Sequence, residues 1–411
     1  MECSWRARVA LVITVLTTAV APASTGSVTE ADAIRQFLEQ SPQARRVPLV
    51  VESVDAALRA ETRVSNPDVA YQVEDAAGVR DEFLTFQQEL PITGRRGLLN
   101  KRAEVATSAA GLAAARDLQT EVFDLKRSFH EVLYRERVLE RLRSGSELLL
   151  QAVQILAARE REGEGSGYDV LRAEQELADL RMTTAAANAA LATARSGFGS
   201  FYDSNLNMDT ARLESGLTPS DPIPEVDQAV TQALQQRLDL RSLSAARERL
   251  DLERRAARRR RFPEPVLTAG WKRTEALGLS DTGFIAALTV PLPIFDRGRL
   301  EAVRATSEGE RVELEAEILT RRIRAEVQAA VVREQAARKV AVGYGEDVER
   351  RAGELHRIAR LKYDEGESGI LELLDAHRTS LTMQLRALAA RHEAKIAEID
   401  RDRVIGNEVK P

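Results

Sequence analysis

The chain repeats itself once, and this duplication constrains its fold more than any other feature. Three landmarks recur in the same order, as NPDV (66–69), LPITGRRG (90–97) and GSGYDVL (165–171) in one half and PEPV (263–266), LPIFDRG (292–298) and ESGILELL (367–374) in the other. Pro91 and Pro293 are 202 residues apart, and so are Ser166 and Ser368. This shared order predicts a tandem duplication of roughly 200 residues per unit.

Each unit has the same order of parts. Short helices are expected at 28–40 and 51–64 in the first unit and at 225–260 in the second. Alternating apolar residues then predict strand pairs at about 67–91 and 265–292. The alternation is carried by Val69, Tyr71, Val73, Leu84, Phe86, Leu267, Ala269 and Trp271.

Long helical hairpins follow both strand pairs. In the first unit, 95–162 holds no proline, and at 1.5 Å per residue such a helix is roughly 100 Å long. The glycines of 163–167 then predict a turn into a returning helix over 168–199, which has a seam of small apolar residues. The second unit is expected to run as helix from 297 to 363, to turn at 366–369 and to return to about 405.

The boundaries follow from these parts. A signal peptide takes 1–23, the first repeat 24–220 and the second 221–411, and the proline-containing stretch 201–224 links the repeats. Helices of this length cannot bury an apolar stripe within one compact globule. Four strands are also too few to close a membrane barrel, since closed barrels start at eight. The helix lengths and the small number of strands therefore predict an oligomer whose chains share one barrel and one hollow helical bundle.

The N-terminus predicts export. Arg6 and Arg8 precede an apolar run at 9–20, and Ala21 and Ala23 provide the small residues of a cleavage site. The alternative is an N-terminal membrane anchor. Cleavage would remove Cys3, the single cysteine, and an exported chain without disulfides indicates a Gram-negative envelope.

Composition argues against catalysis. Hydrophobic residues make up 44% of the chain but aromatic residues only 4%, which is typical of long helices packed through small side chains. Four histidines, without the His-Glu-x-x-His spacing, leave little material for a metal site, and no nucleophile is paired with a base. We therefore expect no enzyme, no cofactor and no resident metal. The arginine-rich run 254–261 is interpreted as a helix C-terminus near lipid headgroups rather than as a nucleic-acid patch.

These motifs together resemble the TolC-like family of outer-membrane channel proteins. The resemblance covers about 28–405 and rests on the signal peptide, the two units, the NP before the first strand pair, the PITGRRG and PIFDRG turns and the YxxGxxxxxxxL tip. It implies a mainly α fold in a homotrimer, with four strands per chain in one 12-stranded outer-membrane barrel on a periplasmic α-helical tunnel. The first strand pair looks most like the branch that serves heavy-metal efflux pumps.

The resemblance also implies site residues. Tyr363, Glu372 and Asp375 occupy the family's gate positions, and Glu372 and Asp375, three residues apart, share one helix face. The family's adaptor-docking tips match Gly163, Gly165, Ser166, Gly167, Gly366, Glu367, Ser368 and Gly369. Its strand-to-helix turns match Pro91, Gly94, Gly97, Pro293, Asp296 and Gly298.

The expected function is a passive exit duct for metal ions or drugs in a tripartite efflux system. Its partners would be a periplasmic adaptor (a membrane fusion protein), an inner-membrane transporter, most readily of the RND type, and outer-membrane lipid. Two alternatives remain open from the sequence, namely a type I protein secretion duct and a soluble periplasmic coiled-coil scaffold or adaptor.

Overall fold

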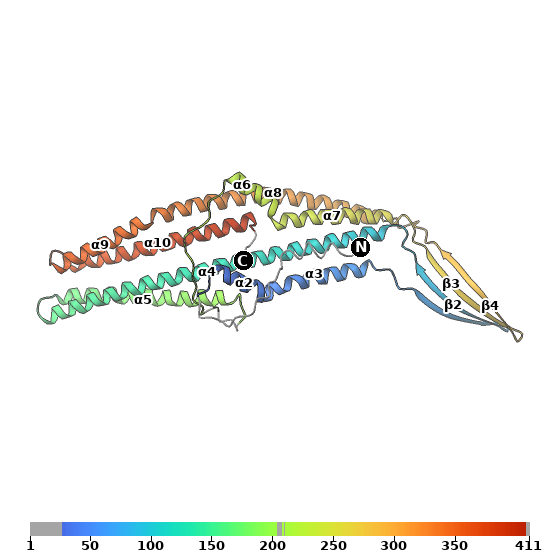
Figure 1. The fold of residues 1–411 in the computed structure, drawn as a ribbon, viewed down its shortest axis with the longest axis horizontal. Helices are drawn as coiled ribbons and strands as arrows, with labels where there is room; N and C mark the ends of the chain where they lie inside the picture. Colours follow the sequence, from blue (N-terminus) through green and yellow to red (C-terminus); the bar gives the residue numbers. More distant parts are fainter. Residues whose placement is uncertain (1–26, 204–207, 209, 408–411) are drawn as a thin grey trace.

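The computed structural model describes residues 27–203, 208 and 210–407, so the expected signal peptide lies outside the described residues. The chain is elongated, with a sheet at one end, helical hairpins at the other and the inter-repeat linker near the middle (Figure 1). The first repeat contributes α2 (Glu30–Gln40), α3 (Pro42–Glu61), β1 (Asp68–Ala76), β2 (Val79–Glu89), α4 (Arg95–Arg161) and α5 (Gly167–Gly199). The second contributes α6 (Val226–Gln236), α7 (Leu238–Arg259), β3 (Val266–Ala276), β4 (Leu279–Thr289), α8 (Arg299–Gly343), α9 (Glu346–Asp364) and α10 (Ile370–Ile405).

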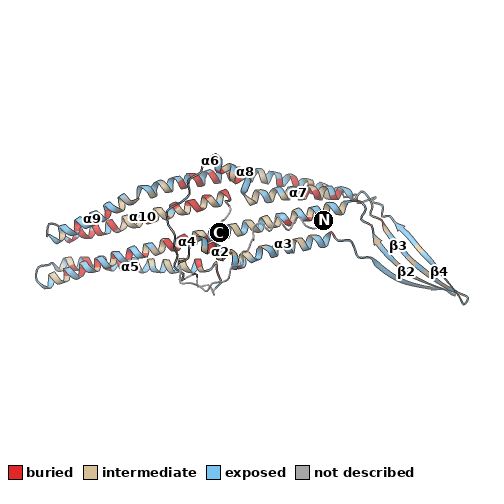
Figure 2. Cartoon of the chain, in the orientation of Figure 1, coloured by how far each residue is buried: buried red, intermediate tan, exposed pale blue. Residues whose placement is uncertain are grey.

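The four strands form one antiparallel sheet in the order β1-β2-β3-β4. Each repeat supplies a hairpin closed by two residues with positive φ, Ala77–Gly78 and Leu277–Gly278. The repeats meet at the β2–β3 pairing, which runs from Val79 opposite Ala276 to Glu89 opposite Val266. Most strand residues are exposed on both faces of the single chain, as the pale colour of the sheet in Figure 2 shows.

One glycine in the sheet is required by close packing. A Cβ on Gly270 would lie 2.2 Å from the carbonyl oxygen of Leu84 on the neighbouring strand. No side chain fits at that distance, so Gly270 permits the central β2–β3 pairing that joins the two repeats.

The helix preceding the first strand pair is longer than the sequence predicted. A helix was expected over 51–64, but α3 begins at Pro42 and contains Pro48. The start is fixed by Ser41, whose Oγ accepts a hydrogen bond from the Ala44 N–H at 3.1 Å, and by Pro42 at the first helical position. Pro48 lies inside this helix, and because proline usually interrupts helices, the sequence did not predict one that crosses it.

The expected unbroken helix over 297–363 is wrong. It is divided into α8 and α9, because Tyr344 and Gly345 leave helical geometry and Gly345 adopts extended backbone with φ −65° and ψ −164°. Two glycines flank Tyr344, and each lowers helix stability by about 1 kcal/mol relative to alanine. In contrast, α4 continues for 67 residues through Gly111 and Gly145.

Side chains from both repeats share the core near the hairpin tips. One apolar cluster joins α4 and α5 to α9 and α10, and its members include Leu149, Leu156, Leu177, Ile370 and Leu374. The two hairpins are therefore packed against each other along their inner faces.

A second junction ties the linker to the helices at mid-length. The Glu334 carboxylate is fully buried between Arg338 and Arg401, and Arg401 Nη1 lies 3.1 Å from both of its oxygens. Glu398, also buried, accepts hydrogen bonds from the backbone N–H groups of Ser220 and Asp221 at 3.0 and 2.9 Å. This charged network anchors the linker to α8 and α10.

Candidate channel entrance at the hairpin tips

The two hairpin tips use the same turn. Each helix ends at a glycine with positive φ, Gly163 with +81° and Gly366 with +77°. The N–H of Gly163 donates to the carbonyl of Glu160, and the N–H of Gly366 donates to that of Tyr363. Such left-handed glycines satisfy the last carbonyls of a helix, so both tips reverse the chain in a few residues.

The structure changes which tip residues correspond. Gly163 and Gly366 are 203 residues apart rather than the 202 inferred from Ser166 and Ser368. Ser166 is the N-cap of α5, where its Oγ accepts from the N–H of Tyr168 at 3.2 Å, whereas the N-cap of α10 is Gly369. The serine pairing expected from the sequence is therefore displaced by one residue, and only the first tip has a side-chain cap.

Two further tip residues differ in their packing. A Cβ on Gly165 would lie 2.9 Å from the backbone nitrogen of Glu160, so the first tip requires glycine there. The expected tip residues Gly167 and Glu367 lie at the start of α5 and within the second turn, where the Glu367 N–H donates to the Lys362 carbonyl at 2.8 Å.

Tyr363 lies in the last turn of α9 and packs half-buried against the shared tip core. The guanidinium of Arg159, at the end of α4, lies 5.6 Å from the centre of its ring. Burial raises the pKa of the Tyr363 hydroxyl, and the carboxylate of Asp169 acts in the same direction, while Arg159 opposes both. The tyrosine therefore joins the two hairpins while its hydroxyl stays neutral at physiological pH.

Glu372 and Asp375 lie together on the first two turns of α10 and are exposed, while Leu373, Leu374 and Ala376 face the core. This arrangement follows from the 3.6-residue period, which directs residues three apart to one side. The structure thus places both acidic residues on a face of the hairpin that the single chain leaves open.

Sequence reasoning missed Arg159, Asp169 and one further link between the hairpins. Arg378 on α10 donates to Glu176 on α5, with 2.9 Å between Nε and Oε1. Charged side chains within a few turns of both tips are the signal that would have identified these residues.

The strand-to-helix turns are ordered by glycines with positive φ. Gly94 (+70°) and Gly298 (+69°) are the N-caps of α4 and α8, and Asp296 Oδ1 accepts from the N–H of Gly298 at 2.9 Å. A Cβ on Gly298 would lie 2.1 Å from the carbonyl oxygen of Ala257, so the start of α8 packs tightly on the end of α7.

The remaining turn residues and the arginine run complete this junction. Pro91 and Pro293 follow the strands, and Gly97 already lies inside α4. The arginine-rich run ends α7, and a groove of about 560 Å³ there is lined in part by Arg258, Arg261, Arg297 and Arg299.

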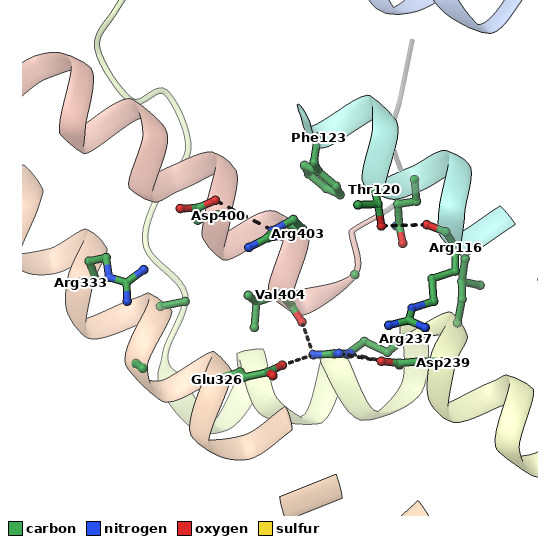
Figure 3. Close-up of a pocket in the computed structure, with 15 residues that line it drawn as sticks. Arg116, Thr120, Phe123, Arg237, Asp239, Glu326, Arg333, Asp400, Arg403 and Val404 are labelled. Atoms are coloured by element: carbon green, nitrogen blue, oxygen red, sulfur yellow. Dashed lines mark hydrogen bonds and ion pairs between the residues drawn. The ribbon is translucent and has the colours of Figure 1, made fainter. Parts of the chain in front are cut away.

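A cavity of about 410 Å³ lies at mid-length, far from the tips, and is bounded by α4, α8, α10 and the α6–α7 break. Figure 3 shows Arg237 between Asp239 and Glu326, with 2.7 Å to each carboxylate. Its charges are largely used to hold helix ends together, and Arg237 Nη1 also reaches the Val404 carbonyl. We interpret the cavity as a structural joint.

Two kinds of feature are absent from the described residues, a membrane-spanning helix and a cluster of metal-binding side chains. Within 27–203, 208 and 210–407 no helix is long and apolar enough to cross a membrane. The same residues include no cluster of three or more histidine, cysteine, aspartate or glutamate side chains suited to a metal ion.

Comparison with known proteins identifies relatives of the chain. Residues 229–407 match the family described as outer membrane efflux protein. The chain is 26% identical over 370 residues to the cobalt-zinc-cadmium resistance protein CzcC of Cupriavidus metallidurans, which covers 87% of this chain and 84% of CzcC.

Solved structures share the fold. A membrane protein from Pseudomonas aeruginosa has a TM-score of 0.75 at 17% identity, covering 94% of this chain and 98% of that one. The outer membrane protein VceC from Vibrio cholerae has a TM-score of 0.73 at 14% identity, covering 92% and 96%.

The tandem hairpins and the four-stranded sheet define a TolC-like fold, mainly α-helical with a small antiparallel sheet. The chain matches the outer membrane efflux proteins in its second repeat, and over most of its length it is similar to CzcC. It is an outer-membrane exit duct of a tripartite efflux system, with its helices in the periplasm, where it works with an adaptor and an inner-membrane pump. Members of this family are channels rather than enzymes.

Proposed function

We propose that three copies of this chain form one duct for divalent metal ions. The assembly is inferred from the shape of the chain, which has a four-stranded sheet at one end and two hairpins at the other. Within the described residues β1 pairs only with β2, and β4 only with β3, so each outer edge offers a full row of backbone groups. Twelve strands from three copies close these edges into one barrel.

The proposed cargo follows from the similarity to CzcC, whose name describes resistance to cobalt, zinc and cadmium. The resemblance of the first strand pair to the heavy-metal branch supports the same class. An RND-type inner-membrane transporter supplies the energy, and drugs or secreted proteins are the competing cargoes.

We propose that the tips dock the adaptor and that Tyr363, Glu372 and Asp375 narrow the entrance. The exposed acidic face on α10 supports this role, because three copies place six carboxylates around one axis. Closely spaced carboxylates attract cations and repel one another, which favours cation selectivity and outward opening. Tyr363 connects this face to Arg159 of the other hairpin.

Planar-bilayer recording on the detergent-extracted protein, with its mass measured in the same preparation, tests the assembly. We expect discrete cation-preferring channels from a species of three chains. A monomer without conductance would refute the proposed duct. The cargo is tested in a deletion strain that lacks this protein but keeps a competent pump. Expression of the protein should restore growth on zinc, cobalt or cadmium, but not on drugs.

The entrance is tested by Glu372→Ala combined with Asp375→Ala. We expect higher conductance and reduced preference for cations, since six carboxylates leave the constriction. Glu310→Ala combined with Glu313→Ala is the matched control, because it removes two exposed carboxylates at the same spacing on α8, far from the tips. Equal effects of the two pairs, or no effect of the first, would contradict the gate.

A further inference from the structure

Two histidines face one small cavity close to the entrance. His356 lies on α9, two turns before Tyr363, and His377 lies on α10, two turns after its start. The centres of their rings are 5.2 Å apart, and the ring planes are inclined by 60°. The cavity has a volume of about 40 Å³ and is lined mainly by apolar side chains of α4 and α10, including Leu149 and Leu373, with Arg360 and Asp364 of α9 as its charged neighbours.

Each of these histidines has a buried ring nitrogen without a hydrogen-bond partner. The atoms are Nδ1 of His356 and Nε2 of His377, and the side chain of His377 belongs to a residue only 8% exposed. An unpartnered buried polar atom is unfavourable, so native proteins rarely keep one without a function or a bound ligand. Both atoms belong to residues that line the same cavity, on neighbouring helices.

The pair contrasts with the other histidines of the chain. His130 Nε2 lies 2.8 Å from the Glu30 carboxylate, and the ring of His392 stacks on Tyr134 with 4.4 Å between ring centres. Each of these two also has one buried ring nitrogen without a hydrogen-bond partner, Nδ1 of His130 and Nε2 of His392, so an unpartnered nitrogen does not by itself distinguish the tip pair. Only the tip pair brings two imidazoles together around a cavity, among the residues that the structure describes.

The separation suits two ligands of one metal ion. Zinc binds imidazole nitrogen at about 2.1 Å in tetrahedral geometry, which places the centres of two coordinating rings roughly 5 Å apart. Imidazole selects zinc, cobalt, nickel and copper over magnesium and calcium. Because the described residues hold no group of three metal-binding side chains, water completes the coordination, and the cavity is large enough for it.

We propose that His356 and His377 bind one imidazole-preferring divalent transition-metal ion per chain, in the wall between α9 and α10. The bound ion fastens the two helices of the second hairpin two turns from Tyr363, so it restrains the entrance from within the wall. This site is independent of the exported cargo. It lies behind apolar side chains within the wall, and it needs only the free metal ion.

The test is zinc binding by the mature full-length protein in detergent, purified without a histidine tag and stripped with chelator. Calorimetry with ZnCl₂ and the visible spectrum with CoCl₂ should give one ion per chain and a tetrahedral cobalt band. His356→Gln and His377→Gln should each weaken binding by roughly tenfold or more. The double variant should bind zinc at least as weakly as the worse single variant, because no imidazole ligand of the ion then remains.

His392→Gln is the matched control, since it removes another histidine of α10, one that is half-buried, and should bind zinc like the native chain. No binding by the native protein at millimolar zinc, or equal binding by the double variant, would overturn the proposal. His356 is half-buried, so its variant keeps the test decisive even where His377→Gln does not fold. A channel that conducts metal ions and yet binds no zinc at these residues would overturn the site and leave the proposed duct standing.

Discussion

The two repeats share an order of elements but differ in how their long helices are built. In the first repeat α4 is one helix of 67 residues, while in the second the corresponding length is divided between α8 and α9. The glycines explain much of the difference. Gly145 continues as helix in α4, where an added Cβ would lie 3.2 Å from Leu381 Cδ2 of α10, whereas nothing lies within 4 Å of one on Gly343.

Packing supports the helical glycine of α4, although a glycine can stay helical without it, since Gly353 lies inside α9 with nothing within 4 Å of an added Cβ. Gly145 permits close contact between α4 and α10, and that contact supplies tertiary stabilisation. Gly343 and Gly345 lack such a neighbouring helix surface, and the chain leaves helical geometry between them. The second repeat thus carries the hairpin with Tyr363, Glu372 and Asp375 on a helix that starts anew.

The repeats also differ in their mid-length ion pairs. In the first repeat His130 of α4 contacts Glu30 of α2. In the second, Glu334 of α8 is held by Arg338 and Arg401 and is fully buried. The first junction holds a half-buried carboxylate, Glu30, whose pKa is lowered by its neighbours, while the second holds a fully buried carboxylate between permanently charged groups, so the two junctions should respond differently to mutation and to pH.

The largest expected effect is at the second junction. Glu334→Gln removes the buried carboxylate between Arg338 and Arg401, leaves Arg401 with Asp402 as its remaining close carboxylate, and should lower the free energy of unfolding by about 3 kcal/mol. Thermal unfolding of the detergent-solubilised protein measures the loss. Glu253→Gln, at an ion pair near the protein surface, is the control and should cost far less. Equal losses would show that the buried network contributes nothing special.

Proline substitution should separate the continuous helix from the broken one. Ser144→Pro interrupts the middle of α4 and should cost about 3 kcal/mol. Glu346→Pro places proline at the first position of α9, after a residue already extended, and should be nearly neutral. Ser144→Ala controls for loss of the side chain. Similar melting temperatures for the two proline variants would contradict the difference described here.

The first junction should weaken in acid. Burial raises the pKa of Glu30, but the contacts with His130 and Lys126 outweigh burial and lower it from 4.5 to about 2. A lowered folded-state pKa gives stability that is present above pH 4.5 and lost as the pH falls towards 2, by about 2 kcal/mol at pH 3. Unfolding measured between pH 7 and 3 should show this loss, and Glu30→Gln should reduce the slope. If the stability of Glu30→Gln fell with pH as steeply as that of the native protein, groups other than Glu30 would cause the acid sensitivity.

The smallest effects test the glycines. Gly145→Ala brings a methyl group against Leu381 and should destabilise the protein by about 1 kcal/mol. Gly343→Ala should instead stabilise it by up to about 1 kcal/mol, through higher helix propensity in open space. Opposite shifts in melting temperature are the expected result. Shifts of the same sign would mean that packing does not distinguish the two positions.

Much of the fold could be predicted from sequence because its signals are local and long. The mainly α class with a small antiparallel sheet is confirmed, and the four strands lie inside the ranges given by residue alternation. The break at Tyr344 and the start of α3 at Pro42 were missed. In both cases a glycine or proline was judged by propensity, while neighbouring helices and caps decided the outcome.

The entrance was harder to predict. Its turns could be read from glycine spacing, but the one-residue shift between Ser166 and Ser368 depends on which residue adopts positive φ. The contacts of Tyr363 with Arg159 and of Arg378 with Glu176 join residues about 200 positions apart. No periodic pattern encodes contacts of that range, so the role of the tips stays a prediction until the variants are measured.

The two-residue turns at the ends of the strands have a consequence for the cell surface. In the proposed duct, with the helices in the periplasm, Ala77–Gly78 and Leu277–Gly278 lie at the far end of the sheet and face the outside (Figure 1). Turns of two residues are too short to fold over the mouth of such a barrel as a lid. In this proposal, control of passage therefore belongs to the hairpin tips at the opposite end of the molecule, inside the envelope.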